Sequence, residues 1–344
     1  MKPCNKKSVY IGVLLMVSVA SLTIYVLSKE FGLNMVLSVL KRINPLFLIP
    51  AVFCMLMFSL GEALNIRIGL NLSGYNTGIV SALKYAYTGF FFSSVTPSAS
   101  GGQPAQIYAM HKDKIKVSHA SFSLFLELIG YEVASISIAT LGLIVSLVSP
   151  LKLFEGLNIG WVLILGFSLN FLLLTCLLLI MFSKKAVKVI ASIIIKTVSL
   201  FSKKKDTKMK ILKIFAEYRV SAKRLKKNKL VLAKIILISL IQFVSYHSIT
   251  YFCYRSFNLN ERSFFEMMSL QGLLFTSVSC IPLPGSSGAM EGGFGLLFRK
   301  VFSNGLIGSA IVLCRLISFA LPLILSGTFI VFARRPFRLK SYEK

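Results

Sequence analysis

The chain has 344 residues, of which 55% are hydrophobic and only 15% charged, and its formal net charge is +27. Apolar residues this abundant, gathered in runs near the roughly 20 residues that cross a bilayer, exclude a soluble globular protein and indicate an all-α polytopic integral membrane protein. The lysines cluster at the ends of the apolar runs, where anionic lipid attracts them, so nucleic-acid binding is not expected.

Eight apolar segments are predicted in chain order, near residues 8–28, 46–64, 79–95, 118–149, 160–182, 231–255, 264–281 and 305–330. The first has a basic start but no small-residue cleavage site before Lys29, so we interpret it as a retained span and not as a signal peptide. The six cysteines and three histidines are scattered without metal-ligand or disulfide spacing, so neither a metal nor a cofactor is expected.

Two short polar runs rich in glycine and proline interrupt this pattern. They are Thr96–Pro104 (TPSASGGQP) and Pro282–Gly293 (PLPGSSGAMEGG), and they align on their prolines. Backbone that breaks a helix at membrane depth is tolerated only where protein or a water-filled cavity satisfies it, so two breaks in corresponding halves point to a transport site. The expected breaking residues are Pro97, Gly101, Gly102, Pro104, Pro284, Gly285, Gly288 and Gly292, with the glycines permitting turns and close helix packing more than substrate contact.

The charges between the segments decide between two topologies. If 79–95 crossed the membrane fully, the stretch Lys184–Lys234, with its 17 Lys and Arg residues, would lie outside, against the positive-inside rule. If 79–95 and 98–111 instead form a re-entrant hairpin from the cytoplasm, that stretch stays inside. The segments 264–281 and 285–300 can then form a second hairpin from the outer face. Thirty of the 39 basic residues lie inside in this arrangement.

The favoured topology therefore has about six full spans and two re-entrant helical hairpins, arranged as an inverted repeat within one domain, 1–344. The halves are about 1–150 and 160–335, and both termini are expected in the cytoplasm. Between them, 184–230 is predicted to contain a basic amphipathic helix that lies on the anionic inner leaflet or docks a partner or lipid head groups. Arg67 and Lys84 are interpreted as snorkelling anchors.

Acidic residues at membrane depth are candidates for the transport site, because they are costly there and usually face a cavity or a partner. They are Glu62, Glu127, Glu132, Glu266 and Glu291. Glu291 follows the second break, where it could meet a cationic head group, cap a half-helix or pair with Arg315, and Arg315 could instead hold a lipid phosphate. Glu127 and Glu132 are five residues apart, so one is expected to line the cavity while the other is paired or protonated. Gln103 could bind head-group oxygens or the broken backbone.

The same residues carry a family resemblance. The run from Thr96 to Tyr108, the run from Pro282 to Phe294 and Arg315 in the last span together resemble the flippase-like transmembrane region of lysylphosphatidylglycerol synthases, the multiple peptide resistance factors. The resemblance covers nearly the whole chain. Full-length members join this region to a cytoplasmic domain that transfers lysine from lysyl-tRNA to phosphatidylglycerol. Here the sequence stops at Lys344, so we expect that domain, and with it any catalytic residue, to be absent. Many relatives place Glu-Arg where this chain has Glu127-Leu128.

The resemblance implies a lipid translocase of the bacterial plasma membrane, which moves lysyl-phosphatidylglycerol or a related phospholipid or glycolipid between leaflets and confers resistance to cationic antimicrobial peptides. One alternative is the phosphatidylglycerol lysyltransferase itself, acting with a separate catalytic chain. Another is a membrane scaffold for a glycosyltransferase or another envelope-assembly enzyme. No nucleotide-binding loop is present, so transport is expected to be passive or driven by an ion gradient, and the chain could form a homo-oligomer.

Overall fold

The structure is a computed structural model that describes residues 39, 41, 43–96, 99–148, 160–201, 205–279, 281, 288–302 and 305–332. Regular secondary structure in these residues is helical throughout. The predicted first segment, 8–28, lies outside the described residues, as do Pro97, Pro284 and Gly285 of the two breaks.

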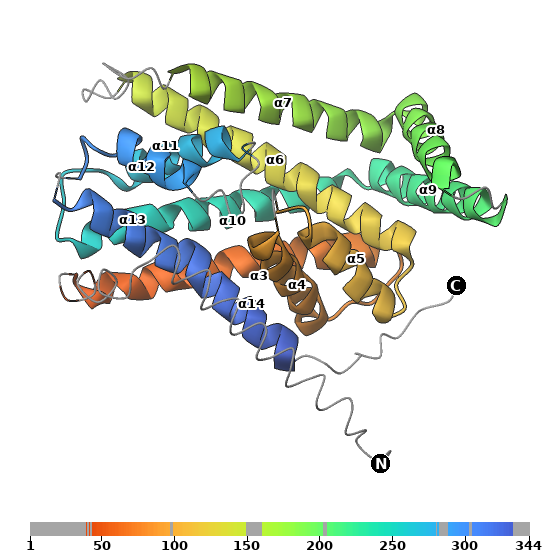
Figure 1. The fold of residues 1–344 in the computed structure, drawn as a ribbon, viewed down its shortest axis with the longest axis horizontal. Helices are drawn as coiled ribbons and strands as arrows, with labels where there is room; N and C mark the ends of the chain where they lie inside the picture. The colour runs from red at the N-terminus through yellow and green to blue at the C-terminus, as the bar shows by residue number, and fades with distance from the viewer. Residues whose placement is uncertain are drawn as a thin grey trace, which may run out of the picture.

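Long apolar helices form the body of the molecule (Figure 1). They are α3 (Leu48–Leu72), which the short helix η1 (Pro45–Phe47) precedes, α6 (Val117–Val148), α7 (Gly160–Phe182), α10 (Lys229–Ser256), and α13 (Ile307–Arg315), which continues through the π-helical turn η4 (Leu316–Ala320) into α14 (Leu321–Phe332). Among the described residues, five helical stretches are long and apolar enough to cross a membrane. The prediction of a polytopic helical membrane protein is confirmed.

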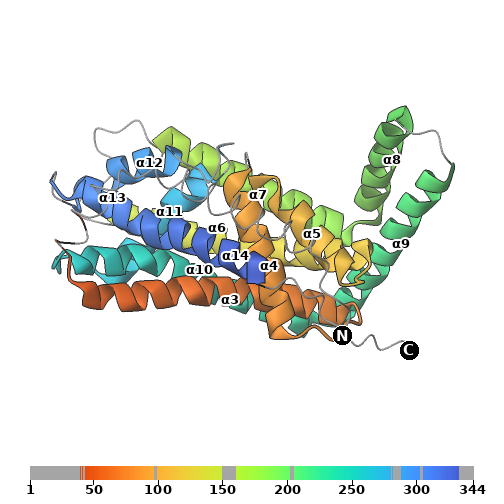
Figure 2. The ribbon, with the colours of Figure 1, turned by 60° about the horizontal axis from the view of Figure 1, so that its bottom comes forward.

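Two pairs of shorter helices occupy the predicted hairpin positions. The first pair is α4 (Ile79–Val95) and α5 (Gly102–Lys112), and the second is α11 (Phe264–Val278) and α12 (Ala289–Leu297). The α4–α5 pair lies toward the end of the bundle that carries α8 and α9, whereas α11 and α12 lie toward the opposite end (Figures 1 and 2). An inverted repeat requires this placement, although the repeat itself stays a prediction.

Glycines at the two breaks explain why the chain can turn there. Gly102 is the first residue of α5, and a Cβ atom on it would lie 3.0 Å from the carbonyl oxygen of Gly89 in α4, so only glycine lets the two helices approach this closely. Gly288 precedes α12 with φ of +83°, which strains any residue with a side chain. Gly101 directly precedes α5, Pro104 lies in its first turn, and Gly292 lies within α12.

The spanning helices pack closely because small residues meet across them. A Cβ atom on Gly69 of α3 would lie 2.8 Å from the Cα atom of Ser123 in α6. Buried polar side chains then join the same helices: Ser123 Oγ donates to the carbonyl oxygen of Ile66 at 2.8 Å, and Asn65 Nδ2 donates to Ser239 Oγ of α10 at 2.9 Å. Such contacts drive helix association where lipid removes the hydrophobic effect between helices.

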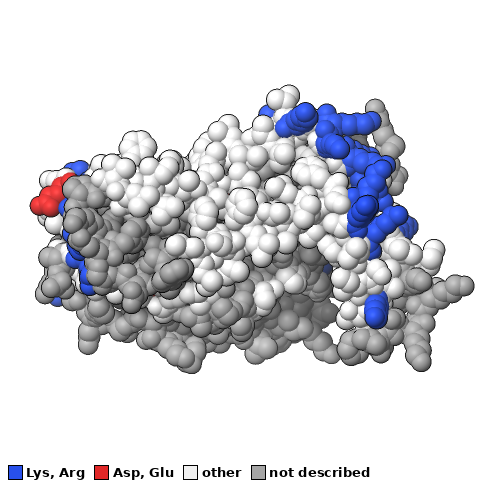
Figure 3. Space-filling model, turned by 90° about the horizontal axis from the view of Figure 1, so that it is seen from above, with Lys and Arg blue, Asp and Glu red and all other residues white. Residues whose placement is uncertain are grey.

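The basic linker forms two helices, α8 (Lys184–Phe201) and α9 (Lys205–Lys227), which extend from one end of the bundle (Figure 2). One face of α9 is buried: Tyr218, Ala222 and Leu225 pack in a cluster with Phe122 and Leu126 of α6. The linker is therefore docked on the spanning helices through α9. Lys and Arg side chains gather at this end of the molecule in the view of Figure 3.

Candidate functional site

A cavity of about 600 Å³ lies between the spanning helices and both helix pairs. Residues of α3, α4, α5, α6, α7, α10, α11 and α14 line it, together with Ala99 and Ser100 from the first break. The α5 contribution is Gln103 and Gln106, and the second pair contributes Phe275 and the adjoining Ser279. The first break and both helix pairs thus contribute to one cavity, as a transport site between two half-structures requires.

Three carboxylates line this cavity: Glu62 of α3, and Glu127 and Glu132 of α6. All three residues are buried, with exposed fractions of 9, 7 and 4%. Glu62 Oε1 accepts a hydrogen bond from Gln106 Nε2 at 3.2 Å. No Lys or Arg is among the described lining residues, and no ion pair joins any of the three acids to a described basic residue. The cavity is therefore suited to a cationic group.

Both Glu127 and Glu132 line the cavity, whereas one of them was expected to line it while the other was paired or protonated. The α6 wall is made by Glu127, Leu128, Tyr131 and Glu132. At about 100° per residue these positions cover an arc of about 140°, so a cavity this wide meets both edges of the helix face. Gln103, which was expected near the head group or the broken backbone, also lies in the lining.

Glu291 and Arg315 lie apart from these acids, as a pair. Arg315 Nε is 2.5 Å from Glu291 Oε1, and Glu291 Oε2 accepts a hydrogen bond from the Gly288 amide at 2.5 Å. Glu291 therefore caps α12 and pairs with Arg315 at the same time. The Arg315 guanidinium also lies 4.6 Å from the centre of the Phe319 ring. The space beside the pair is only about 20 Å³. Two of the roles considered for Glu291, cap and ion-pair partner, thus occur at once.

A thin wall separates the pair from the large cavity. Tyr246 of α10 and Ser318 of η4 line both spaces. The Glu291–Arg315 pair therefore holds α12 against α13 next to the cavity, while the three carboxylates face its interior.

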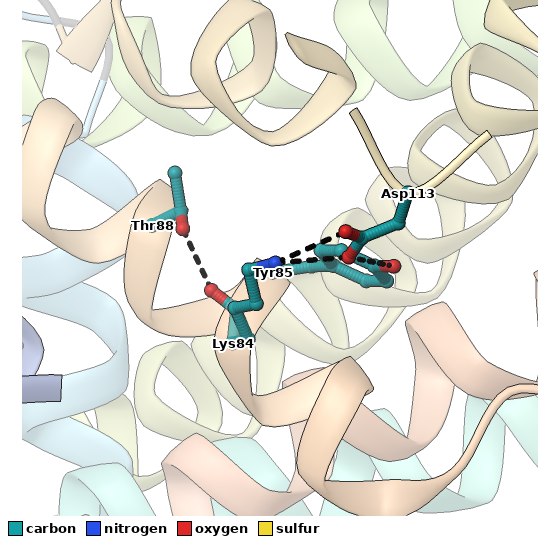
Figure 4. Close-up of polar contacts among 4 residues, drawn as sticks. All are labelled: Lys84, Tyr85, Thr88 and Asp113. Atoms are coloured by element: carbon teal, nitrogen blue, oxygen red, sulfur yellow. Dashed lines mark hydrogen bonds and ion pairs between the residues drawn. The ribbon is translucent and has the colours of Figure 1, made fainter. Parts of the chain in front are cut away.

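A second buried pair fixes the open end of the α4–α5 hairpin, and the sequence analysis missed it (Figure 4). Lys84 Nζ lies 2.9 Å from Asp113 Oδ2, and the Tyr85 hydroxyl donates to the same oxygen at 2.9 Å. The Asp113 side chain is 1% exposed. Lys84 is thus a partner of Asp113 and not the snorkelling anchor that was predicted. Arg67 likewise donates from Nε to the carbonyl oxygen of Thr77 at 3.0 Å.

Glu266, the remaining acidic candidate, lies in the first turn of α11 and outside the large cavity. Its Oε1 atom is 3.6 Å from Arg262 Nη1. The two side chains are 19 and 16% exposed and lie one helical turn apart, a spacing at which an ion pair stabilises a helix by about 0.2–0.5 kcal/mol. The structure thus divides the acidic candidates into paired residues and cavity residues.

Comparison with known proteins identifies the family of the chain. Residues 10–326 match the family described as the lysylphosphatidylglycerol synthase TM region. The chain is also 24% identical over 322 residues to an Archaeoglobus fulgidus protein named UPF0104 membrane protein, and this alignment covers 90% of the chain and 92% of the relative. Because the family match covers most of the sequence, the chain belongs to the lysylphosphatidylglycerol synthase transmembrane-region family.

Proposed function

We propose that this member of the lysylphosphatidylglycerol synthase transmembrane-region family moves a phospholipid with a cationic head group, such as lysyl-phosphatidylglycerol, between the leaflets of the cell membrane. The observation that carries the proposal is the cavity of about 600 Å³ in which Glu62, Glu127 and Glu132 meet without a basic lining residue among those described. A lysyl ester carries two ammonium groups at neutral pH, which these carboxylates could bind.

Electrostatics supports this choice of head group. Acidic side chains within a membrane protein are costly and usually serve substrates, ions or protons. Three of them around one cavity repel one another, and a cationic head group would relieve that repulsion while it crosses. A plain anionic phospholipid would add a negative charge to the same space. The cavity therefore favours the lysyl ester over its unmodified parent.

The remaining polar lining residues suit the other parts of such a lipid. The side-chain amides of Gln103, Gln106 and Asn170 and the hydroxyls of Ser93 and Ser94 can donate hydrogen bonds to phosphate and ester oxygens. A volume of about 600 Å³ falls within the roughly 300–1,000 Å³ that small-molecule sites usually occupy. The acyl chains would stay in the bilayer beside the helices. Delivery of the lysyl ester to the outer leaflet makes that surface less negative and so weakens attraction of cationic peptides.

Lipid flipping can be measured directly in proteoliposomes that hold fluorescent lysyl-phosphatidylglycerol or fluorescent phosphatidylglycerol, with dithionite quenching the outer leaflet. We expect the intact chain to accelerate loss of the inner-leaflet signal for the lysyl ester at least tenfold more than for its parent. The double variant Glu127→Gln/Glu132→Gln should lose this preference. Glu266→Gln removes an acid outside the cavity and should behave as the intact chain does.

Two results would contradict the proposal. One is equal rates for the two lipids, which would remove the role of the cavity charge. The other is no acceleration with any lipid by protein that elutes as a folded, monodisperse species, which would favour the enzyme or scaffold roles considered for the sequence.

A further inference from the structure

A second cavity, of about 260 Å³, lies where α7, α8 and α9 meet. Four of its nine lining residues are basic, and none is acidic. Lys184 is the first residue of α8, and Arg219, Lys223 and Lys226 lie on α9. Its apolar lining comes from Met181, Phe182, Val187 and Ala222. A space lined by basic and apolar side chains, with no acid, is opposite in charge to the large acidic cavity.

We propose that this second cavity binds the phosphate group of an anionic phospholipid. The site is independent of the proposed translocation path, since it shares no lining residue with the acidic cavity. It would hold a resident lipid at the end of the bundle, where the spanning helix α7 ends and the basic linker begins.

The spacing of the basic residues along α9 places their charges on one face of the helix. Arg219, Lys223 and Lys226 are spaced by four and three residues, so they form one stripe along the helix. The nearest acid on α9, Glu217, is turned toward α6, where it accepts a hydrogen bond from Ser118 and lies 3.5 Å from Lys116 Nζ. Glu217 is absent from the cavity lining, so it does not neutralise the three basic side chains that an anion would meet there.

The surroundings favour a lipid over a free phosphate ion. On α7, Leu179 and Phe182 are 54 and 44% exposed, and they lead along the helix to the cavity. On α8, Val189 and Ile193 are 57 and 58% exposed. An acyl chain could cover these side chains while the head group meets the lysines, as in amphipathic helices that lie at an anionic interface. Because α7 is long and apolar enough to span the membrane, lipid surrounds its exposed side chains and lies next to the cavity.

The size of the cavity also fits a head group. A volume of about 260 Å³ lies just below the roughly 300–1,000 Å³ of sites that hold whole small-molecule ligands, so it suits a phosphate diester with part of its glycerol. Lysine and arginine are the side chains that phosphate groups most often meet in proteins, arginine through paired hydrogen bonds and lysine as a point charge.

The test uses the full chain in a mild, uncharged detergent and measures its unfolding temperature as lipid is added. The variant Arg219→Gln/Lys223→Gln/Lys226→Gln removes the stripe. Its matched control is Lys185→Gln/Lys213→Gln/Lys227→Gln, which removes the same charge from exposed residues of α8 and α9 outside the cavity. Phosphatidylglycerol should stabilise the intact chain and the control, and the stripe variant should need at least tenfold more lipid for the same shift.

Phosphatidylcholine and inorganic phosphate distinguish the possible ligands. Neither should reproduce the shift that phosphatidylglycerol gives at equal concentration. An equal shift with inorganic phosphate would overturn the lipid assignment, and an equal shift with phosphatidylcholine would show that charge is not recognised. Equal losses in the stripe variant and its control would reduce the effect to general attraction. If the triple variant does not fold, Arg219→Gln and Lys223→Gln alone should each weaken the response several-fold, and unchanged responses would overturn the site.

Discussion

Two groups of acidic residues in this molecule differ in their partners. Asp113 and Glu291 are each held by a basic side chain, Lys84 and Arg315, within the structure. Glu62, Glu127 and Glu132 instead share a large cavity whose described lining has no base. Depth in the bundle does not separate the groups, because Asp113 and Glu132 are similarly buried, at 5 and 4%. The two groups differ instead in whether a basic side chain within the protein pairs with the acid.

The difference indicates what each group is for. An ion pair that closes within the protein fixes the two elements that carry it, and here each pair joins the ends of a hairpin or links a hairpin helix to the next span. Carboxylates without such a partner reduce stability, and residues of this kind are retained where function needs them. The comparison therefore predicts that the two groups respond oppositely to removal of charge.

The largest effect is expected from Arg315→Met. The change leaves the Glu291 carboxylate without its cation in a space of only about 20 Å³, which holds little water to replace it. Loss of one partner of a buried pair costs about 3–5 kcal/mol, and because the Glu291 side chain is 26% exposed we expect about 3 kcal/mol less free energy of unfolding. Unfolding in mixed micelles by increasing dodecyl sulfate measures the change.

The control for this experiment comes from the other group. Glu127→Gln removes a cavity carboxylate of similar burial, and the free energy of unfolding should change by no more than about 1 kcal/mol, or rise, because charge repulsion falls. If Glu127→Gln destabilised the protein as much as Arg315→Met, the cavity acids would be structural, and the distinction between the two groups would be wrong.

A smaller loss is expected from Lys84→Met. Asp113 would keep its hydrogen bond from Tyr85 but lose the ammonium group, so a buried carboxylate would be left only partly satisfied. We expect a loss of about 2 kcal/mol, below the full cost of a broken buried pair because Asp113 keeps its hydrogen bond from Tyr85 and Lys84 itself is 16% exposed. Thermal unfolding in detergent measures it.

The double variant Lys84→Met/Asp113→Leu tests the cause of that loss. Replacement of both partners by apolar side chains can be nearly neutral, so the double variant should recover at least half of the stability that Lys84→Met loses. No recovery would mean that the methionine itself disturbs α4 and that the pair contributes little.

The sequence could predict the spans that the described residues contain, because those apolar runs are long enough to cross a bilayer. It could also predict the positions of both helix pairs, because glycine and proline interrupt the apolar pattern there. It could also name the acidic candidates. It could offer the Glu291–Arg315 pair only as one of several roles, and it could not offer the Lys84–Asp113 pair, whose members are 29 residues apart across a hairpin. Which acids have internal partners depends on how the hairpins are placed, and no periodicity in the sequence records that.

The linker shows the same limit. The basic amphipathic helix predicted within 184–230 is present as α9, but the sequence did not show that α8 would be a separate helix or that α9 would dock on α6. An apolar stripe facing a bilayer and one facing a protein have the same pattern. The signal that could have distinguished them is Glu217, the only acid in the stretch 207–234, which meets Ser118 and Lys116 at the start of α6.

The smallest effect is expected at this acid, and it depends on pH. The hydrogen bond from the Ser118 hydroxyl, together with nearby Lys116, holds the pKa of the Glu217 carboxyl below its ordinary value. The Glu217 carboxyl thus binds a proton more weakly in the folded state than in the unfolded state. The docking of α9 is therefore stabilised above the ordinary carboxyl pKa of about 4.3, and it loses that stabilisation as the pH falls through the lower pKa of the folded state. Since water screens the site, the contribution should stay below about 1 kcal/mol.

Amide exchange in α9, corrected for intrinsic rates, should accelerate between about pH 5 and pH 3 in the intact chain and much less in Glu217→Gln. An equal acceleration in both proteins would assign the docking of α9 to its apolar face alone.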